Sequence, residues 1–381
     1  MASPRTVFKG EHELFRRSVS AFIDREVAPH YERWEKEGQV SREVWRKAGE
    51  AGLLLTDVPE EYGGAGADFL YSAVMIEEMA KRVFAAPGFR LHSDIVAPYI
   101  LNYGSEEQKR AWLPRLVSGK AIGAHAITEP GAGSDVFSLS SRAVRKPGGY
   151  VLTGQKTFST NAPVADLVLA FAYLQRDGQS PALTAFLVPR ETDGVTFGKA
   201  ISKMGLRTSP MGEVIFEDCF VPEAARLGPE GAGMRIFNSA MEWERACIFA
   251  GHLGAMERLL DDCIVYAKKR KQFGQPIAKF AAVADRIADM RVAIEAGRWL
   301  LYKVGWLTGQ GKSAVLESAM AKLFVSEMHS KAALDALQLH GGYGYMKEYP
   351  IEREVRDALS GTLYSGTSEM QRKIIASCLG L

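Results

Sequence analysis

The spacing of the apolar residues changes twice along the chain, and this constrains the fold more than any other feature of the sequence. Between residues 11 and 117 apolar side chains recur at spacings of three and four, as in Phe15 and Val19, which predicts helices. Between about 122 and 222 short runs rich in β-branched and aromatic residues alternate with turn residues, which predicts strands. After Gly233 the helical spacing returns in long amphipathic runs. The sequence therefore predicts helical, β and helical parts, in that order.

These parts are long enough to carry cores of their own. The chain has 381 residues, of which 47% are hydrophobic, and this is ample for two or three packed domains. We expect an N-terminal helical domain at residues 1–121, a β-barrel-like middle domain at 122–228 and a C-terminal four-helix bundle at 229–381. The predicted fold class is mainly α with a central β-domain.

Charge and cysteine content argue against several classes of protein. The 47 basic and 45 acidic side chains leave a formal net charge of +2, too small for the basic field that binds nucleic acid or an anionic membrane. No apolar run reaches the roughly 18 residues of a membrane-spanning helix, and the first residues lack the apolar stretch of a signal peptide. The scattered cysteines and histidines show no metal-ligand spacing. We therefore expect a cytoplasmic protein without a metal, a nucleic-acid partner or a membrane span.

One glutamate lies on an apolar helical face in the third part. If residues 240–253 are helical, the neighbours of Glu244 on its face are all apolar or small: Ala240, Met241, Cys247, Ile248 and Gly251. Burial on such a face raises the pKa of a carboxylic acid toward the range useful for proton transfer. Glu244 is thus a candidate base, or else a buried acid paired with a distant cation. Glu242 instead faces Arg245, with which it is expected to pair at the surface.

A glycine-rich loop follows a predicted strand in the middle part. Its sequence is AITEPGAGSD, at residues 126–135. Gly131 and Gly133 permit close approach of the backbone to a ligand, and Thr128 and Ser134 supply hydroxyls. The loop is either a ligand-binding loop or an ordinary Gly/Pro turn.

Several motifs resemble those of the acyl-CoA dehydrogenase family and occur in the family's order. They extend over nearly the whole chain: AITEPGAGSD at 126–135, GQK at 154–156, KMG at 203–205, FED at 216–218, RKQFG at 270–274, GG at 341–342 and LYSGTSE at 363–369. Any single match would be a weak signal, whereas together they are a strong one. The resemblance implies the family's three-domain fold and an FAD-dependent flavoprotein.

The resemblance also implies two groups of FAD-binding residues. The first group contacts the flavin ring and the pyrophosphate: Ile127, Thr128, Ser134, Phe158, Thr160 and Thr367. The second group binds FAD across a subunit boundary, with Gln338 and Gly342 near its adenine half: Arg270, Gln272, Phe273, Gln338 and Gly342. In the family the arginine that matches Arg270 reaches the FAD of a neighbouring subunit, where a guanidinium suits phosphate geometry. An oligomer is therefore implied, expected to be a homotetramer built as a dimer of dimers.

The family's C-terminal signature differs in this chain at one position. Many members carry their catalytic glutamate where this chain has Ser365, and a serine hydroxyl is too weak a base to replace it. Isovaleryl-CoA and long-chain acyl-CoA dehydrogenases carry the glutamate on the first helix of the C-terminal bundle, in a stretch that resembles WERA at 243–246. The resemblance thus implies that Glu244 is the base. It further implies that backbone donors at Ser365 and Gly366 bind the thioester carbonyl, so that Ser365→Ala leaves substantial activity whereas Glu244→Gln abolishes most of it.

The implied activity is α,β-dehydrogenation of an acyl thioester. Glu244 removes the α-proton while the β-hydride passes to flavin N5. Either coenzyme A or a carrier protein holds the acyl or aminoacyl group, and the electrons leave to electron-transfer flavoprotein or to oxygen. Two alternatives stay open: a flavin oxidase or monooxygenase on the same fold, and a non-catalytic binding or assembly protein.

Overall fold

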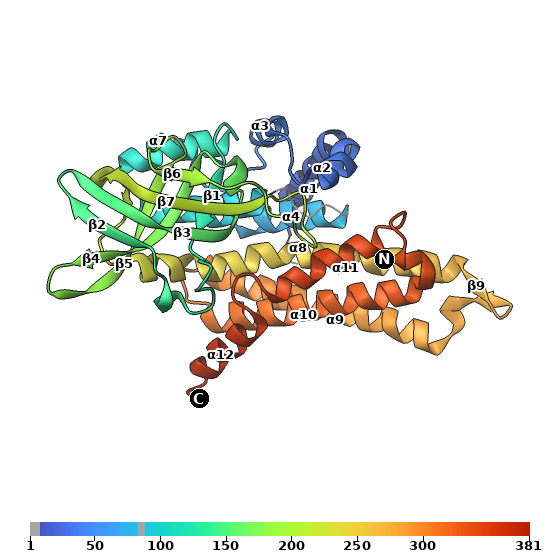
Figure 1. The fold of residues 1–381 in the computed structure, drawn as a ribbon. Coiled ribbons are helices and arrows are strands. Elements are labelled where there is room, and N and C mark those ends of the chain that lie inside the picture. Colours follow the sequence, from blue (N-terminus) through green and yellow to red (C-terminus); the bar gives the residue numbers. More distant parts are fainter. Residues whose placement is uncertain (1–7, 83–87) are drawn as a thin grey trace.

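The computed structural model describes residues 8–82 and 88–381, and its first part is helical, as predicted (Figure 1). Ser105 caps one of these helices: its hydroxyl accepts from the backbone N–H of Gln108, and the N–H of Ser105 donates to the Gln108 side chain. Two amide groups at the start of the helix are thereby satisfied. The helices are α1 (Gly10–Phe22), α2 (Tyr31–Glu37), α3 (Arg42–Glu50), α4 (Phe69–Lys81), α5 (Phe89–Leu91), α6 (Ala97–Tyr103) and α7 (Glu106–Val117), with π-helical turns at Ile23–Val27 and His92–Val96.

The middle part forms an eight-stranded sheet in the order β6-β7-β3-β2-β4-β5-β8, with β1 parallel to β4. Strands β1 to β7 lie between residues 123 and 222, so the prediction of strands in this part is confirmed. Inward-facing side chains form a separate core, in which Tyr150 meets Phe186 edge to face with ring centroids 5.2 Å apart. The strands are β1 (Gly123–Ala126), β2 (Arg142–Lys146), β3 (Gly149–Thr160), β4 (Leu167–Arg176), β5 (Gln179–Pro189), β6 (Val195–Phe197), β7 (Met211–Pro222) and β8 (Arg226–Leu227).

The third part contains three long helices, α8, α9 and α10, and the shorter α12, as expected of the predicted four-helix bundle. A short hairpin follows the first helix, and one further helix, α11, was not predicted because its nine residues are rich in charge. Within residues 8–82 and 88–381, no helix combines the length and apolarity needed to cross a membrane. The elements are α8 (Gly233–Lys269), β9 (Lys271–Gln272), β10 (Gln275–Pro276), α9 (Ala281–Thr308), α10 (Val315–His340), α11 (Ile351–Leu359) and α12 (Ser368–Cys378).

Helix α8 lies at the centre of the molecule and packs against α4 on one side and against α9 and α10 on the other (Figure 1). Its residues are buried continuously from Glu244 to Met256. Because one helix belongs to the cores of both helical parts, residues in its middle are held from several directions. This is the environment in which the candidate base lies.

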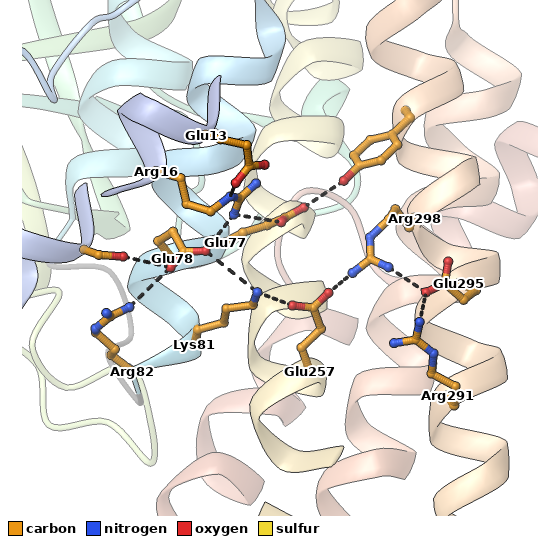
Figure 2. Close-up of polar contacts among 12 residues, drawn as sticks. Glu13, Arg16, Glu77, Glu78, Lys81, Arg82, Glu257, Arg291, Glu295 and Arg298 are labelled. Atoms are coloured by element: carbon orange, nitrogen blue, oxygen red, sulfur yellow. Dashed lines mark hydrogen bonds and ion pairs between the residues drawn. The ribbon is translucent and has the colours of Figure 1, made fainter. Parts of the chain in front are cut away.

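A network of charged side chains connects α1, α4, α8 and α9 (Figure 2). Arg16 of α1 donates to Glu78 of α4 over 2.6 Å. Glu257 of α8 forms ion pairs with both Lys81 of α4 and Arg298 of α9. The N-terminal helices are therefore tied to the bundle by buried or half-buried charges as well as by apolar packing.

Candidate active site

Glu244 lies on α8, eleven residues after its first residue, and its side chain is buried, with 6% of the residue's surface exposed. The neighbours predicted for its face are all buried too, which confirms the helical-face argument. Burial raises the pKa of Glu244 above its ordinary value, although the Ser365 hydroxyl and Arg245 partly offset this. The carboxyl group is thus a stronger proton acceptor when ionised than an exposed glutamate would be.

Ser365 touches Glu244 directly. Its hydroxyl donates to Oε1 of Glu244 over 2.5 Å, across 121 residues of sequence. The backbone turns sharply at this point, with φ of +53° at Ser365 and +84° at Gly366. Gln371 holds the turn by donating from Nε2 to the carbonyl oxygens of Ser365 and Gly366, over 3.1 and 2.9 Å. The serine side chain, although too weak a base to replace a glutamate, therefore orients Glu244.

The charged residues near Glu244 on α8, Arg245 and Glu242, do not pair with each other as expected. Arg245 is buried, and its Nε lies 3.5 Å from the carbonyl oxygen of Ser365. Glu242 accepts from the backbone N–H of Ala314 over 2.6 Å and from the Ser313 hydroxyl over 3.2 Å. The predicted surface pair between Glu242 and Arg245 is therefore wrong, because Glu242 instead binds the start of α10, which helical spacing within α8 could not reveal.

Four residues of the first FAD group meet at one end of the sheet. Ile127 and Thr128 follow β1, and the carbonyl of Thr128 accepts from the N–H of Thr157 in β3 over 2.8 Å. Phe158 and Thr160 end the same strand. Phe158 has φ of +53° and leaves 60% of its surface exposed, which is unusual for an aromatic residue in a strand. These two segments thus present hydroxyl, backbone and aromatic groups together.

A buried ion pair, not predicted from the sequence, fixes the shape of the glycine-rich loop. Lys156 donates to Oε1 of Glu129 over 2.7 Å and lies 3.3 Å from the carbonyl oxygen of Ile127. Glu129 also accepts from the N–H and hydroxyl of Ser140 and from the N–H of Ser141. Although burial opposes it, these donors lower the pKa of Glu129 to about 2. The loop that leads to Ser134 is therefore anchored at an ionised carboxylate.

Stacked aromatic rings place this end of the sheet against α8. The ring of His125 in β1 stacks on Tyr99 at 5.8 Å and on Phe237 of α8 at 6.4 Å. The Tyr99 hydroxyl donates to the carbonyl oxygen of Phe237 over 3.0 Å. Phe237 precedes Glu244 by about two helical turns. The flavin-loop end of the sheet and the candidate base therefore lie in adjoining parts of the interior.

The other residues predicted to bind FAD lie in two separate places. Thr367 caps α12, its hydroxyl accepting from the N–H of Met370, directly after the turn at Ser365. The second FAD group lies at the distal end of the bundle, around the β9 hairpin and the end of α10 (Figure 1). There the Arg270 guanidinium lies 5.6 Å from the centre of the Tyr343 ring, and Phe273 is 93% exposed. Since α8 is about 55 Å long at 1.5 Å per residue, one chain does not bring the two groups together.

The first group fits a flat aromatic cofactor. The exposed Phe158 ring is what such a cofactor would cover, and Ser134 offers an exposed hydroxyl in the loop. A Cβ added at Gly131 or Gly133 would meet nothing within 4 Å, so this part of the loop is open to a ligand. Aromatic, hydroxyl and backbone groups of this kind are those that hold a flavin and its phosphates.

Comparison with known proteins identifies the class as acyl-CoA dehydrogenases. Family models of the N-terminal, middle and C-terminal domains of acyl-CoA dehydrogenase match residues 9–120, 124–219 and 231–380. The mitochondrial long-chain specific acyl-CoA dehydrogenase of Sus scrofa is 40% identical over 98% of this chain and 87% of its own. The L-prolyl-[peptidyl-carrier protein] dehydrogenase of Pseudomonas fluorescens is 42% identical over 88% of this chain and 90% of its own.

Solved structures agree. The FAD complex of PigA superposes with a TM-score of 0.94 at 35% identity and covers all of both chains. The chain therefore belongs to the acyl-CoA dehydrogenase family, and the predicted resemblance and three-domain fold are confirmed. It is an FAD-dependent flavoprotein oxidoreductase that dehydrogenates an acyl thioester at a CH–CH bond.

Proposed function

We propose that Glu244 is the base that removes the α-proton of the thioester. The observation that carries this proposal is the 2.5 Å contact between Ser365 and Glu244 at a buried position whose surroundings raise the pKa of the glutamate. A buried carboxylate with one fixed hydrogen bond has a defined orientation and accepts a proton readily. Bound FAD supplies the acceptor for the β-hydride, at N5.

The thioester carbonyl is activated, in this proposal, by backbone N–H groups at Ser365 and Gly366. The positive φ angles at both residues turn the backbone sharply beside the base. A fixed donor that binds the oxygen as negative charge develops contributes about 3 kcal/mol to catalysis. The FAD-binding role of the two residue groups is part of the same proposal, the second group serving the cofactor of a neighbouring subunit.

We also propose that the protein is a cytoplasmic homotetramer, a dimer of dimers. Helix α9 exposes a row of large apolar side chains at seven-residue spacing: Val292, Trp299 and Trp306, which are 68%, 59% and 60% exposed. Such a row is typical of a helix face covered by another subunit. The described cysteines are unpaired, in keeping with a reducing compartment.

The domain limits proposed are those expected above, at residues 1–121, 122–228 and 229–381.

The acyl carrier is either coenzyme A or a carrier protein, and relatives of both kinds are similar to this chain. The proposed electron acceptor is electron-transfer flavoprotein, with oxygen as the alternative. The test is anaerobic mixing of the holoenzyme with matched CoA and carrier-protein thioesters while flavin absorbance is followed. Bleaching by one series identifies the carrier. Bleaching by neither, with FAD fully bound, contradicts the proposed reaction.

A further inference from the structure

A chain of buried polar side chains leads from α11 to the residue before Ser365. The Tyr364 hydroxyl lies 2.6 Å from Nε2 of His252 on α8. Nδ1 of His252 lies 2.7 Å from Nδ1 of His329 on α10. Nε2 of His329 makes a bent contact of 2.9 Å with Oε1 of Glu354 on α11. Three helices thus converge on Tyr364, and the reaction proposed above uses none of these four side chains.

This chain of side chains begins at an ionised carboxylate. Although burial opposes it, Arg258 and His329 hold the pKa of Glu354 at about 2, so the carboxylate only accepts. The Nε2–H of His329 therefore faces Glu354, while Nδ1 of His329 meets Nδ1 of His252. Burial holds the pKa of His252 well below its usual value, so its ring is neutral, with one N–H and one acceptor nitrogen. The Tyr364 hydroxyl can donate or accept, so it pairs with Nε2 of His252 whichever of the two ring nitrogens carries the proton.

The packing around His252 leaves this arrangement little freedom. Its ring stacks on Phe249 with centroids 4.7 Å apart. Gly361 lies against the Cε1 edge of the ring, where an added Cβ would be 2.4 Å from Cε1 of His252. The segment that carries Tyr364 and Ser365 therefore packs closely against the histidine, and the Tyr364 hydroxyl fixes the segment's position beside it.

We infer that Tyr364 is a positioning residue for the dehydrogenation proposed above: its hydroxyl, held by His252, His329 and Glu354, fixes the backbone at Ser365 so that the serine hydroxyl stays on Glu244. Ser365 has φ of +53°, a conformation that a side-chain-bearing residue rarely keeps unless its surroundings impose it. Gln371 holds this turn from the carbonyl side, and Tyr364 holds it from the side of the preceding residue.

A double-mutant cycle on the acidic limb of the pH profile tests this inference, which rests on the proposed function. Besides Ser365, the titratable and charged groups that act on Glu244 are Arg245 on α8, Tyr99 on α6 and Tyr364 itself. The variants are Tyr364→Phe, Ser365→Ala and the two combined. Each is measured as holoenzyme by anaerobic flavin reduction, at the midpoint of the wild-type acidic limb.

Tyr364→Phe is expected to slow flavin reduction at that pH by about twofold to tenfold, the effect of one hydrogen bond. It should also move the acidic limb of the pH profile to higher pH. If Tyr364 acts through Ser365, the double variant has the same acidic limb and the same flavin-reduction rate as Ser365→Ala alone. The inference is overturned if the fold-changes of the two single variants multiply in the double variant, or if Tyr364→Phe behaves as wild type. A wild type that no thioester reduces counts against the proposed function instead.

Two further variants keep the test specific. Tyr302→Phe removes another buried tyrosine hydroxyl, 3.4 Å from Glu77, and is expected to leave the limb in place. His252→Gln breaks the contact with His329 but keeps a side chain that can donate to or accept from the Tyr364 hydroxyl. The acidic limb of its pH profile should therefore move less than that of Tyr364→Phe. A larger shift in His252→Gln than in Tyr364→Phe contradicts the inference.

Discussion

The hydroxyl of Ser365 donates to the carboxylate of Glu244 over 2.5 Å, so the residue in the C-terminal signature is in direct contact with the proposed base. Glu244 supplies the carboxylate, and Ser365 supplies its hydrogen-bond donor. The two positions therefore act as a pair.

Ser365→Ala is expected to keep substantial activity at high pH and to lose it at low pH. Glu244 must be ionised to accept the α-proton, and the serine hydroxyl stabilises the ionised form. Without that donor the pKa of Glu244 rises further, so the acidic limb of kcat/KM moves to higher pH. A pH series of flavin-reduction rates checks this. A limb that stays in place or moves to lower pH contradicts the assigned contact.

Lys156→Met is expected to destabilise the holoenzyme by about 3–5 kcal/mol, because it leaves a buried carboxylate without its cation. Glu129 and Lys156 both have almost no exposed side-chain surface. Urea unfolding measures the change. The matched control is the double variant Glu129→Gln with Lys156→Met, which removes both charges and should recover part of the loss. A double variant less stable than Lys156→Met contradicts the account.

Arg298→Met is expected to lower the free energy of unfolding by about 1.5–3 kcal/mol, the contribution of a hydrogen bond to a charged group. Arg298 is buried between Glu257 and Glu295 (Figure 2). Arg291→Met is the control, because Arg291 pairs with the same Glu295 from a position whose side chain is 38% exposed. The control should cost at most about 1 kcal/mol. Equal losses in the two variants would show that burial of the charge network does not matter.

Arg270→Ala is expected to weaken FAD binding by about tenfold or more while leaving the fold intact, because a guanidinium that contacts phosphate makes charge-assisted hydrogen bonds. Arg270 lies at the distal end of the bundle, so the effect requires a neighbouring subunit. Fluorescence titration of the apoprotein with FAD gives the affinity, and Lys269→Ala serves as a neighbouring cationic control. Unchanged FAD affinity in Arg270→Ala argues against a cofactor shared between subunits.

Local features of this protein were predictable from sequence, and contacts between distant segments were not. The face of Glu244 could be read from residues three and four positions away, since helical geometry fixes those neighbours. The contact with Ser365 spans 121 residues, and that of Lys156 with Glu129 spans 27. Glu242 was assigned to the wrong partner for the same reason, because spacing within one helix says nothing of the helix packed beside it.

The sequence motifs predicted function where the spacing of residues could not. The glycine-rich loop could be read either as a turn or as a ligand site, and only its resemblance to the family decided between them. His252 and His329 carried no signal at all, because they show no metal spacing and lie 77 residues apart. Their contact depends on how α8 packs against α10.

The central claim, that Glu244 is the base, is tested most directly by the rate of anaerobic flavin reduction in Glu244→Gln. The amide keeps the size of the side chain but cannot accept the α-proton, so the rate should fall about 10²- to 10⁴-fold with FAD content and thermal stability unchanged. Glu242→Gln is the control: Glu242 lies two residues before Glu244 on α8 but binds the start of α10, so this variant should reduce its flavin at nearly the wild-type rate. A Glu244→Gln enzyme that keeps its FAD and is reduced by thioester at the wild-type rate would contradict the account.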